Sequence, residues 1–183
     1  MRAILALFGI TTAACSAASV EVEMKEIVYR GGLVKFQIPK DWMEEHGSEG
    51  GGMFFGNGPN SGTLRLDVIT AESPQKLGAN EPVALLEGIK GVEAGVIRRL
   101  ENGNAIASQI IHTSEDGTPI TMYWWYVGSF VPPKHVRLAN FSYTVLTSHE
   151  NDEKIEAEVE MLGVSIERIE FFPSIGNFSN SEN

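Results

Sequence analysis

Two turn signals, Asn102-Gly103 and Asp116-Gly117, constrain the fold of this chain more than any other feature. They separate three segments rich in apolar and β-branched residues, VIRRLE, AIASQIIHT and ITMYWWYV. Asn-Gly and Asp-Gly favour the type I′ turn, whose twist matches that of two antiparallel strands. The sequence therefore predicts two consecutive antiparallel hairpins in this part of the chain.

The second hairpin also predicts a register. If Asp116 and Gly117 are its two loop residues, Ser108 lies opposite Trp125 and Ala107 opposite Tyr126, so that small side chains face large ones. Large side chains then occupy both faces of the aromatic strand, with Met122, Trp124 and Tyr126 on one face and Tyr123, Trp125 and Val127 on the other. We expect this strand to be central and covered on both sides.

Helices and further strands are predicted on either side of these hairpins. Residues 79–91 favour a helix with Asn80 as its N-cap, and residues 149–163 favour an acidic amphipathic helix that ends at Gly163. Residues 135–146 read as a strand, and Gly31-Gly32 indicates an earlier two-residue hairpin.

The segment KFQIPKDW (35–42) raises a separate question, because a strand stops there at a proline. Pro39 cannot donate a hydrogen bond to a sheet. We predict that the chain turns at Pro39 into a short helical segment and that Trp42 folds back onto the end of the core.

These elements together predict one α+β domain, an antiparallel sheet with helices on its faces. The chain has 183 residues and is 43% hydrophobic, which suits one buried core. The domain is expected over residues 19–172, followed by a mobile polar tail over 173–183.

Charge excludes one class of function. The net charge is −10 and the isoelectric point is about 4.9. Binding to nucleic acid requires clustered Lys and Arg side chains, and the chain lacks such clusters, so nucleic acid is not an expected partner.

Residues 1–18 are predicted to be a secretory signal peptide. Arg2 is a minimal positive region, an apolar stretch runs from Ala3 to about Ile10, and small residues follow. The apolar stretch is far shorter than the ~20 residues that span a bilayer. We therefore expect the chain to be exported.

Two cleavages of this signal are considered. Residues 12–15 (TAAC) resemble the lipobox of bacterial lipoproteins, in which the cysteine is lipidated and becomes the first residue, although Thr12 replaces the usual Leu. Residues 16–18 (SAA) form a small-x-small site whose use would discard Cys15. We favour lipidation of Cys15, which predicts a periplasmic or membrane-anchored bacterial protein. As the sole cysteine, Cys15 forms no internal disulfide.

Two short motifs resemble the PsbP-like superfamily, which includes bacterial envelope proteins of the DcrB and LpqN types. The family motif F-x-I-P-x-G-W is similar to residues 36–42, with Asp41 in place of Gly, and a Ser-Ile segment near its last helix is similar to Ser165-Ile166. The likeness covers about residues 29–171. It implies an α/β/α sandwich and a binding, assembly or accessory role. It implies no shared catalytic site, so no functional residue is carried over.

Residues 112–116 (HTSED) contain the residue types of a nucleophilic triad, His112, Ser114 and Asp116. His112 and Ser114 share a face of a strand, but Asp116 is explained by the turn, and triads are normally assembled from separate segments. A hydrolase is the weaker interpretation of this segment, and a solvated hairpin end the stronger one.

Metal ligands are dense in two places. Asp41, Glu44, Glu45 and His46 follow Pro39, and His149, Glu150 and Asp152 lie at the predicted start of the acidic helix. Acidic residues favour helix N-termini in any case, and a short polar turn is typically solvated. No metal site and no cofactor are predicted, and no phosphate-binding glycine loop or Rossmann fingerprint is present.

The aromatic cluster Tyr123, Trp124, Trp125 and Tyr126 is the remaining candidate site. Aromatic residues dominate core burial, so these residues are expected in the core, but an incompletely covered face could hold an apolar ligand. The sequence thus favours a non-enzymatic envelope protein that is anchored by lipid at Cys15 and acts through protein contacts. The alternative is a carrier of a small apolar ligand or lipid with its pocket beside the aromatic strand.

Overall fold

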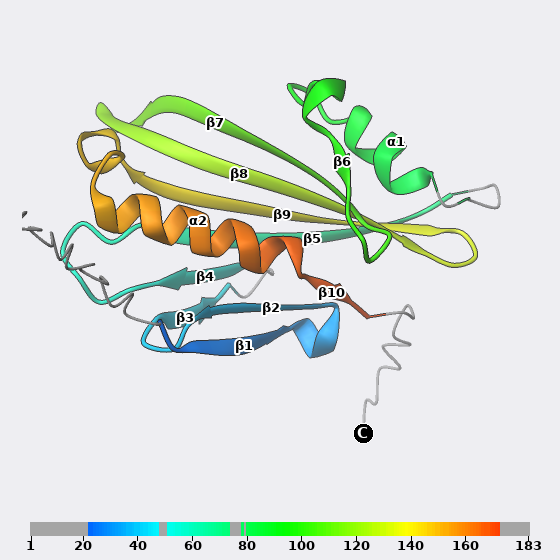
Figure 1. The fold of residues 1–183 in the computed structure, drawn as a ribbon, viewed down its shortest axis with the longest axis horizontal. Helices are drawn as coiled ribbons and strands as arrows, with labels where there is room; N and C mark the ends of the chain where they lie inside the picture. Colours follow the sequence, from blue (N-terminus) through cyan, green and yellow to red (C-terminus); the bar gives the residue numbers. More distant parts are fainter. Residues whose placement is uncertain (1–21, 48–50, 74–77, 79, 173–183) are drawn as a thin grey trace, which may run out of the picture.

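The computed structural model describes residues 22–47, 51–73, 78 and 80–172. Within them, two antiparallel sheets and two α-helices form the fold (Figure 1). The larger sheet has the strand order β3-β4-β5-β9-β8-β7-β6, and the smaller one β1-β2-β10. The predicted signal peptide with Cys15 and the predicted tail over 173–183 lie outside the described residues.

The strands of the larger sheet are β3 (Met43–His46), β4 (Gly52–Phe55), β5 (Thr63–Glu72), β6 (Arg98–Arg99), β7 (Ala105–Glu115), β8 (Thr118–Val131) and β9 (His135–Leu146). Those of the smaller sheet are β1 (Met24–Tyr29), β2 (Val34–Pro39) and β10 (Glu170–Phe171). The α-helices are α1 (Glu81–Glu87) and α2 (Glu153–Glu167), and the short 3-10 helices are η1 (Arg30–Gly32), η2 (Ala94–Val96) and η3 (Thr147–His149).

Both predicted hairpins are present, and the predicted register of the second is confirmed. Ala107 pairs with Tyr126 and Ser108 with Trp125, as the turn at residues 116–117 requires. Asp116 and Gly117 have φ angles of 49° and 79°, the left-handed conformation that a type I′ turn needs at both central positions. The β6–β7 hairpin differs in its turn: its strands pair from Arg99 opposite Ala105, so the loop spans residues 100–104 and is not a two-residue turn at Asn102-Gly103.

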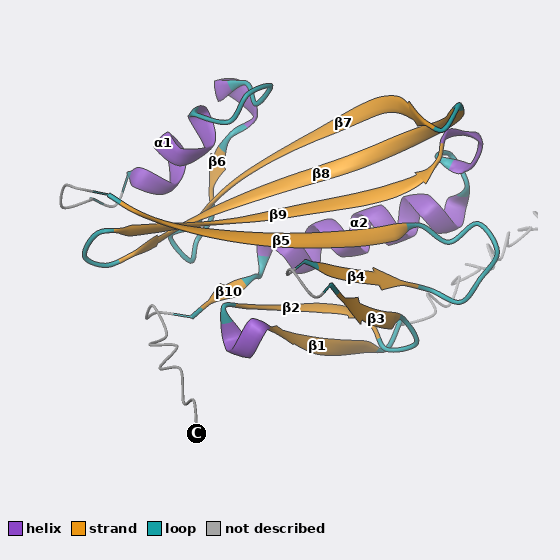
Figure 2. Cartoon of the chain, turned by 180° about the vertical axis from the view of Figure 1, so that it is seen from behind, coloured by secondary structure: helices purple, strands orange, loops and turns teal. Residues whose placement is uncertain are grey.

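Layers cover both faces of the larger sheet, which confirms the α+β fold class (Figures 1 and 2). On one face, Leu86 of α1 packs with Ala107 and Tyr126. On the other, the main core joins α2 and the smaller sheet to residues such as Trp125 and Phe141. β8 lies between β7 and β9, so the aromatic strand is interior to the sheet.

The segment after Pro39 is a strand, which corrects the predicted helical turn. Residues 43–46 form β3 and pair with β4. Trp42 is nonetheless a core residue as predicted, since only 4% of it is exposed and its ring stacks on Tyr143 at a centroid distance of 6.0 Å. Pairing with β4 satisfies the backbone of this short segment better than one isolated helical turn would.

Both predicted helices have different ends in the structure. α1 ends at Glu87, and its C-cap is Gly88, a residue with poor helix propensity. α2 continues through Gly163 to Glu167. A glycine inside a helix costs about 1 kcal/mol relative to alanine, less than the burial of Ile166 in the following turn contributes.

The first hairpin is also longer than predicted. β1 and β2 pair from Tyr29 opposite Val34, so the loop spans residues 30–33 and contains η1. Arg30, Gly31 and Gly32 all have positive φ angles there. In the part of the chain that the structure covers, no helix is long and apolar enough to cross a bilayer.

Candidate functional site

A cleft of about 900 Å³ lies between α2 and the strands β1 and β2. Its apolar lining comes from several elements and includes Met24, Phe36, Trp42, Ala157, Met161 and Val164. This volume lies within the range of about 300–1,000 Å³ that is typical of small-molecule sites. The cleft is therefore large enough to hold a small molecule.

One face of α2 explains the helix-side lining. Ala157, Met161 and Val164 follow at spacings of four and three residues and so form a stripe along the helix. This stripe is separate from the buried one, which contains Ile155, Leu162 and Ile166. Val164 is 45% exposed, so the second stripe presents apolar surface that the protein itself leaves uncovered.

The strand-side wall depends on Ser165. β10 pairs with β2 only at Val34 and Lys35, so the edge of β2 would be unpaired further along. The Ser165 hydroxyl accepts from the backbone N–H of Gln37 at 3.0 Å and donates to its carbonyl at 2.6 Å. This contact holds α2 beside β2 and fixes the width of the cleft.

One end of the cleft is polar. Gly56, Gly58, Ser61 and Lys154 lie there beside Trp42. The Ser61 hydroxyl oxygen is buried and has no hydrogen-bond partner among the described residues. A Cβ atom at Gly58 would lie 3.2 Å from Lys154 Nζ, so glycine allows the loop to approach the ammonium group.

Behind this end, the Tyr143 hydroxyl donates to the Glu158 carboxylate, which also lies 3.7 Å from Lys154 Nζ. Burial, followed by the hydrogen bond to Glu158, raises the pKa of Tyr143 well above its ordinary value. Tyr143 therefore stays neutral and acts as a fixed donor that orients Glu158 at the cleft wall.

The rim of the cleft carries charges of both signs. Its acidic residues are Glu26, Asp41, Glu158, Glu160 and Glu170, and its basic residues are Lys35, Lys154 and Arg168. The acidic excess gives no concentrated positive potential, which does not suit a polyanionic ligand.

The four aromatic residues predicted as a pocket lie on both faces of the sheet. Tyr123 and Trp125 pack on the side of α2, while Trp124 and Tyr126 stack on each other on the side of α1 at a centroid distance of 5.6 Å. Tyr126 also accepts a hydrogen bond from the Gln109 amide at 2.9 Å. None of the four lines the cleft, and a ligand beside this strand stays a prediction.

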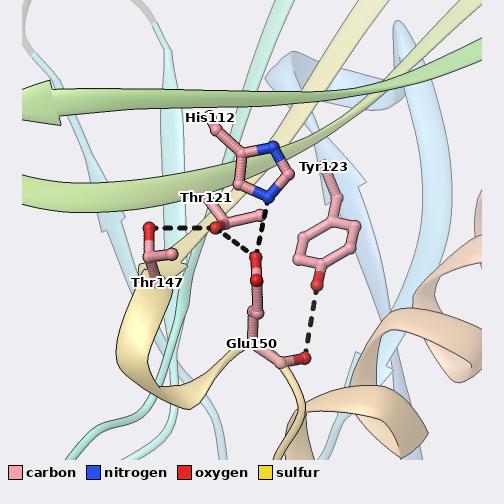
Figure 3. A network of polar contacts seen from close by, with 5 residues as sticks. All are labelled: His112, Thr121, Tyr123, Thr147 and Glu150. Carbon is pink, nitrogen blue, oxygen red and sulfur yellow. Dashed lines mark hydrogen bonds and ion pairs between the residues drawn. The ribbon is translucent and has the colours of Figure 1, made fainter.

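A polar network connects the β7–β8 hairpin to the turn before α2 (Figure 3). The Glu150 carboxylate lies 2.6 Å from the Thr121 hydroxyl and 2.9 Å from His112 Nε2. Because one hydroxyl donates a single proton, Thr121 donates to Glu150 and accepts from Thr147 at 3.1 Å. The Tyr123 hydroxyl adds a long contact of 3.4 Å to the Glu150 carbonyl.

The hydrogen bond from Thr121, followed by that from His112, lowers the pKa of Glu150 below its ordinary range. Glu150 thus stays ionised and ties η3 to the sheet. Thr121 is fully buried, so its hydroxyl is not accessible to a substrate. The arrangement is a structural clamp between segments far apart in the sequence.

The triad considered for residues 112–116 is not assembled. His112 contacts Glu150, and no hydrogen bond joins it to Ser114 or Asp116 among the described residues. Asp116 occupies the turn. The sequence missed Glu150 as the partner because 38 residues separate it from His112.

The predicted groups of metal ligands do not converge. Glu44 and His46 share a face of β3 at 3.9 Å, but Glu44 is paired with Lys25 at 3.0 Å. His149 is bonded to Asp152 at 2.8 Å. Across the described ranges, no group of three or more His, Cys, Asp or Glu side chains is arranged to hold a metal ion.

Arg137 is a buried residue that sequence reasoning did not single out. Its guanidinium donates to the Thr70 hydroxyl at 3.1 Å and to the carbonyls of Leu33 and Phe172 at 3.3 and 2.9 Å. It thereby joins the larger sheet to one end of the smaller sheet, where Leu33 precedes β2 and Phe172 follows β10. Burial lowers the pKa of Arg137 from its ordinary value.

The sequence and the structure were compared with those of known proteins. No protein-family model matches the sequence, and no curated protein matches it. Among solved structures, LpqN of Mycobacterium tuberculosis, which is involved in cell envelope biogenesis, aligns over 84% of this chain and 92% of its own, with 13% identity and a TM-score of 0.55. This chain has the PsbP-like fold.

A second protein with a similar structure comes from Bacteroides thetaiotaomicron. It aligns over 81% of this chain with 18% identity and a TM-score of 0.55, and this chain spans only 48% of its length. At these identities the PsbP-like fold is what is shared. The cleft and its residues must be interpreted from this chain alone.

Proposed function

We propose that this PsbP-like protein is a non-enzymatic binding protein of the bacterial cell envelope that holds a small, elongated, largely apolar ligand. The observation that carries the proposal is the cleft between α2 and β2, with its volume of about 900 Å³ and its exposed apolar stripe on α2. The polar end at Ser61 and Lys154 would receive a neutral or weakly polar end group of that ligand.

Two further observations support the proposal. His112, Ser114 and Asp116 do not form a catalytic unit, because His112 is engaged by Glu150. LpqN, which has a similar fold, is involved in cell envelope biogenesis. An accessory role in the envelope needs a binding surface and no chemistry, and the cleft offers such a surface.

The test is native mass spectrometry of the protein after gentle purification from the envelope. We expect a bound molecule of low mass that is lost in Val164→Glu and Met161→Glu, because each change puts a carboxylate into the apolar stripe. Ile69→Glu is the matched control, since Ile69 is 51% exposed and does not line the cleft.

A second measurement uses a defined probe. Dodecanol titrated calorimetrically into delipidated protein should bind to the native chain and to Ile69→Glu, and not to Val164→Glu. The proposal would be refuted if no molecule co-purifies with the protein and dodecanol also does not bind.

We also propose that the protein is anchored by a lipidated Cys15. Mass spectrometry of the mature N-terminus should find a chain that starts at Cys15 with added acyl mass. A mature chain that starts at Ser19 would refute the anchor and leave the cleft proposal untouched, because the cleft is built from residues 22–170.

A further inference from the structure

β7 leaves most of one edge of the larger sheet unpaired. β6 pairs with β7 only at Ala105 and Ile106, whereas β8 pairs with β7 over its whole length, from Ala105 to Glu115. Figures 1 and 2 show β7 at the border of the sheet, with β6 crossing only one end. Within the described residues, positions 107–115 thus present backbone donors and acceptors with no strand on their outer side.

This edge lacks the features that usually prevent strands from pairing between molecules. Residues 107–114 (ASQIIHTS) contain no Lys, Pro or Gly, and the pairing with β8 is uninterrupted, so no bulge disrupts the edge. By contrast, the edge strand β3 is four residues long and carries Glu44, Glu45 and His46.

Apolar side chains flank the open edge on both faces. Ile110 is 59% exposed and Ile111 is 37% exposed. Neighbouring residues of a strand point to opposite faces, so a strand added here would cover one isoleucine on each side of the extended sheet. Hydrogen bonding and apolar burial therefore favour the same added strand.

Charge does not oppose a second copy of the same strand at this edge. The chain has a net charge of −10, so two copies repel each other over most of their surfaces. The only ionisable side chain in residues 107–114 is His112, and it is paired with Glu150 at 2.9 Å. This stretch is therefore a place where two copies can approach without repulsion between like charges.

We propose that two copies of this chain pair through their β7 strands in antiparallel orientation. The two-fold axis would pass beside Ile110, whose backbone N–H and C=O lie on the outer side of β7, and run normal to the sheet, so that the same surface is used on both copies. The α1 faces of both copies then lie on one side of a continuous sheet and the α2 faces on the other. The clefts stay open, because no cleft residue belongs to β7.

The first test measures the dimer by analytical ultracentrifugation of the full chain in detergent. Ile110→Lys should raise the dissociation constant of the dimer at least about tenfold, because it places two ammonium groups near each other across the axis. Ile69→Lys, on β5 and away from β7, adds the same charge to a comparably exposed isoleucine (51% against 59%) and should leave the dissociation constant unchanged. A native chain that is monomeric at every concentration, or equal effects of both variants, would overturn the proposal.

The second test measures the geometry by disulfide trapping in a chain that carries Cys15→Ser. Identical residues at the axis have Cα atoms about 4.5–5.5 Å apart, within reach of a disulfide. Ile110→Cys should therefore form covalent dimers. Ser114→Cys should not, because its two copies would be separated by about 20 Å or more along the strands.

Trapping of Ile110→Cys by a different polypeptide, with no covalent dimer of this chain, would assign the edge to another protein and overturn self-pairing. Circular dichroism of each variant establishes that the change acts on association and not on folding.

Discussion

Ser165 shows how one side chain can replace a strand. β10 is too short to pair with the whole of β2, and the Ser165 hydroxyl fulfils both hydrogen-bonding needs of Gln37 in its place. The resemblance to the PsbP-like superfamily singled out Ser165 by its motif. Its role follows only from the tertiary structure, because Ser165 and its partner Gln37 are 128 residues apart in the sequence.

Ser165→Ala is expected to lower the free energy of unfolding by about 1–2 kcal/mol, because it leaves a backbone donor and acceptor of Gln37 unpaired. Urea unfolding measures the change. Ser114→Ala is the control, since Ser114 is exposed at the hairpin end and should shift stability by less than about 0.5 kcal/mol. Equal effects of the two substitutions would contradict the role given to Ser165.

Glu150 should make stability depend on pH in the acid range. Its pKa is lower in the folded protein than the ordinary value of about 4.3, so its contribution is present above that value and is lost as the pH falls through the folded pKa. Glu150→Gln should therefore destabilise the protein at neutral pH and make little difference once the carboxyl of the native chain is protonated.

The measurement is a series of urea midpoints at falling pH for the native chain, Glu150→Gln and Glu115→Gln. Glu115 lies exposed at the end of β7, so its substitution controls for the loss of one negative charge. A constant difference between native chain and Glu150→Gln at all pH values would rule out the linkage.

At the scale of elements, Gly128 determines how closely α1 approaches the sheet. A Cβ atom at Gly128 would lie 2.8 Å from the Pro82 carbonyl oxygen and 3.4 Å from the Pro82 Cα atom. The obstacle is backbone, which cannot rotate aside as a side chain could. The absence of a side chain at this position of β8 is thus a condition for the α1 layer.

Gly128→Ala should displace α1 and lower the free energy of unfolding by about 1–3 kcal/mol. Amide hydrogen exchange should show faster exchange in α1 (Glu81–Glu87) than in α2. Gly95→Ala is the matched control, because nothing lies within 4 Å of the Cβ position there, and it should cost no stability. Unchanged exchange of α1 in Gly128→Ala would show that the helix tolerates the added methyl group.

The predictability of α2 differs between its two apolar stripes. The stripe through Ile155, Val159 and Leu162 follows from helical periodicity and is buried, apart from the half-buried Val159. The stripe through Met161 and Val164 obeys the same periodicity, yet only the position of β2 turns it into the wall of a cleft. Periodicity identifies apolar faces but not what lies opposite them.

The whole molecule combines a strongly acidic composition with a β7 edge whose residues 107–114 contain no acidic side chain. Salt screens repulsion between exposed charges, with a screening length of about 10 Å at 0.1 M and about 3 Å at 1 M. We therefore expect added salt to strengthen β7 pairing, since the net charge of −10 opposes association everywhere except at the edge itself.

Sedimentation at rising NaCl concentration checks this expectation. The native chain and Ile69→Lys should shift towards the dimer, while Ile110→Lys should stay monomeric because its added charges are close to each other and partly shielded from salt. A dimer that dissociates on addition of salt would show that ion pairs, and not strand pairing, hold it together.

Local chemistry in the sequence determined the β7–β8 hairpin, its register and the fold class, because the Asp-Gly turn acts over a few residues and specifies which side chains face each other. It did not determine the strand β3, whose partner β4 is needed to satisfy its backbone. Nor did it identify the cleft, the Glu150 clamp or the open edge of β7. The cleft and the Glu150 clamp form where segments far apart in the chain come into contact, and the open edge exists because β6 pairs with only two residues of β7. These contacts depend on how the layers pack.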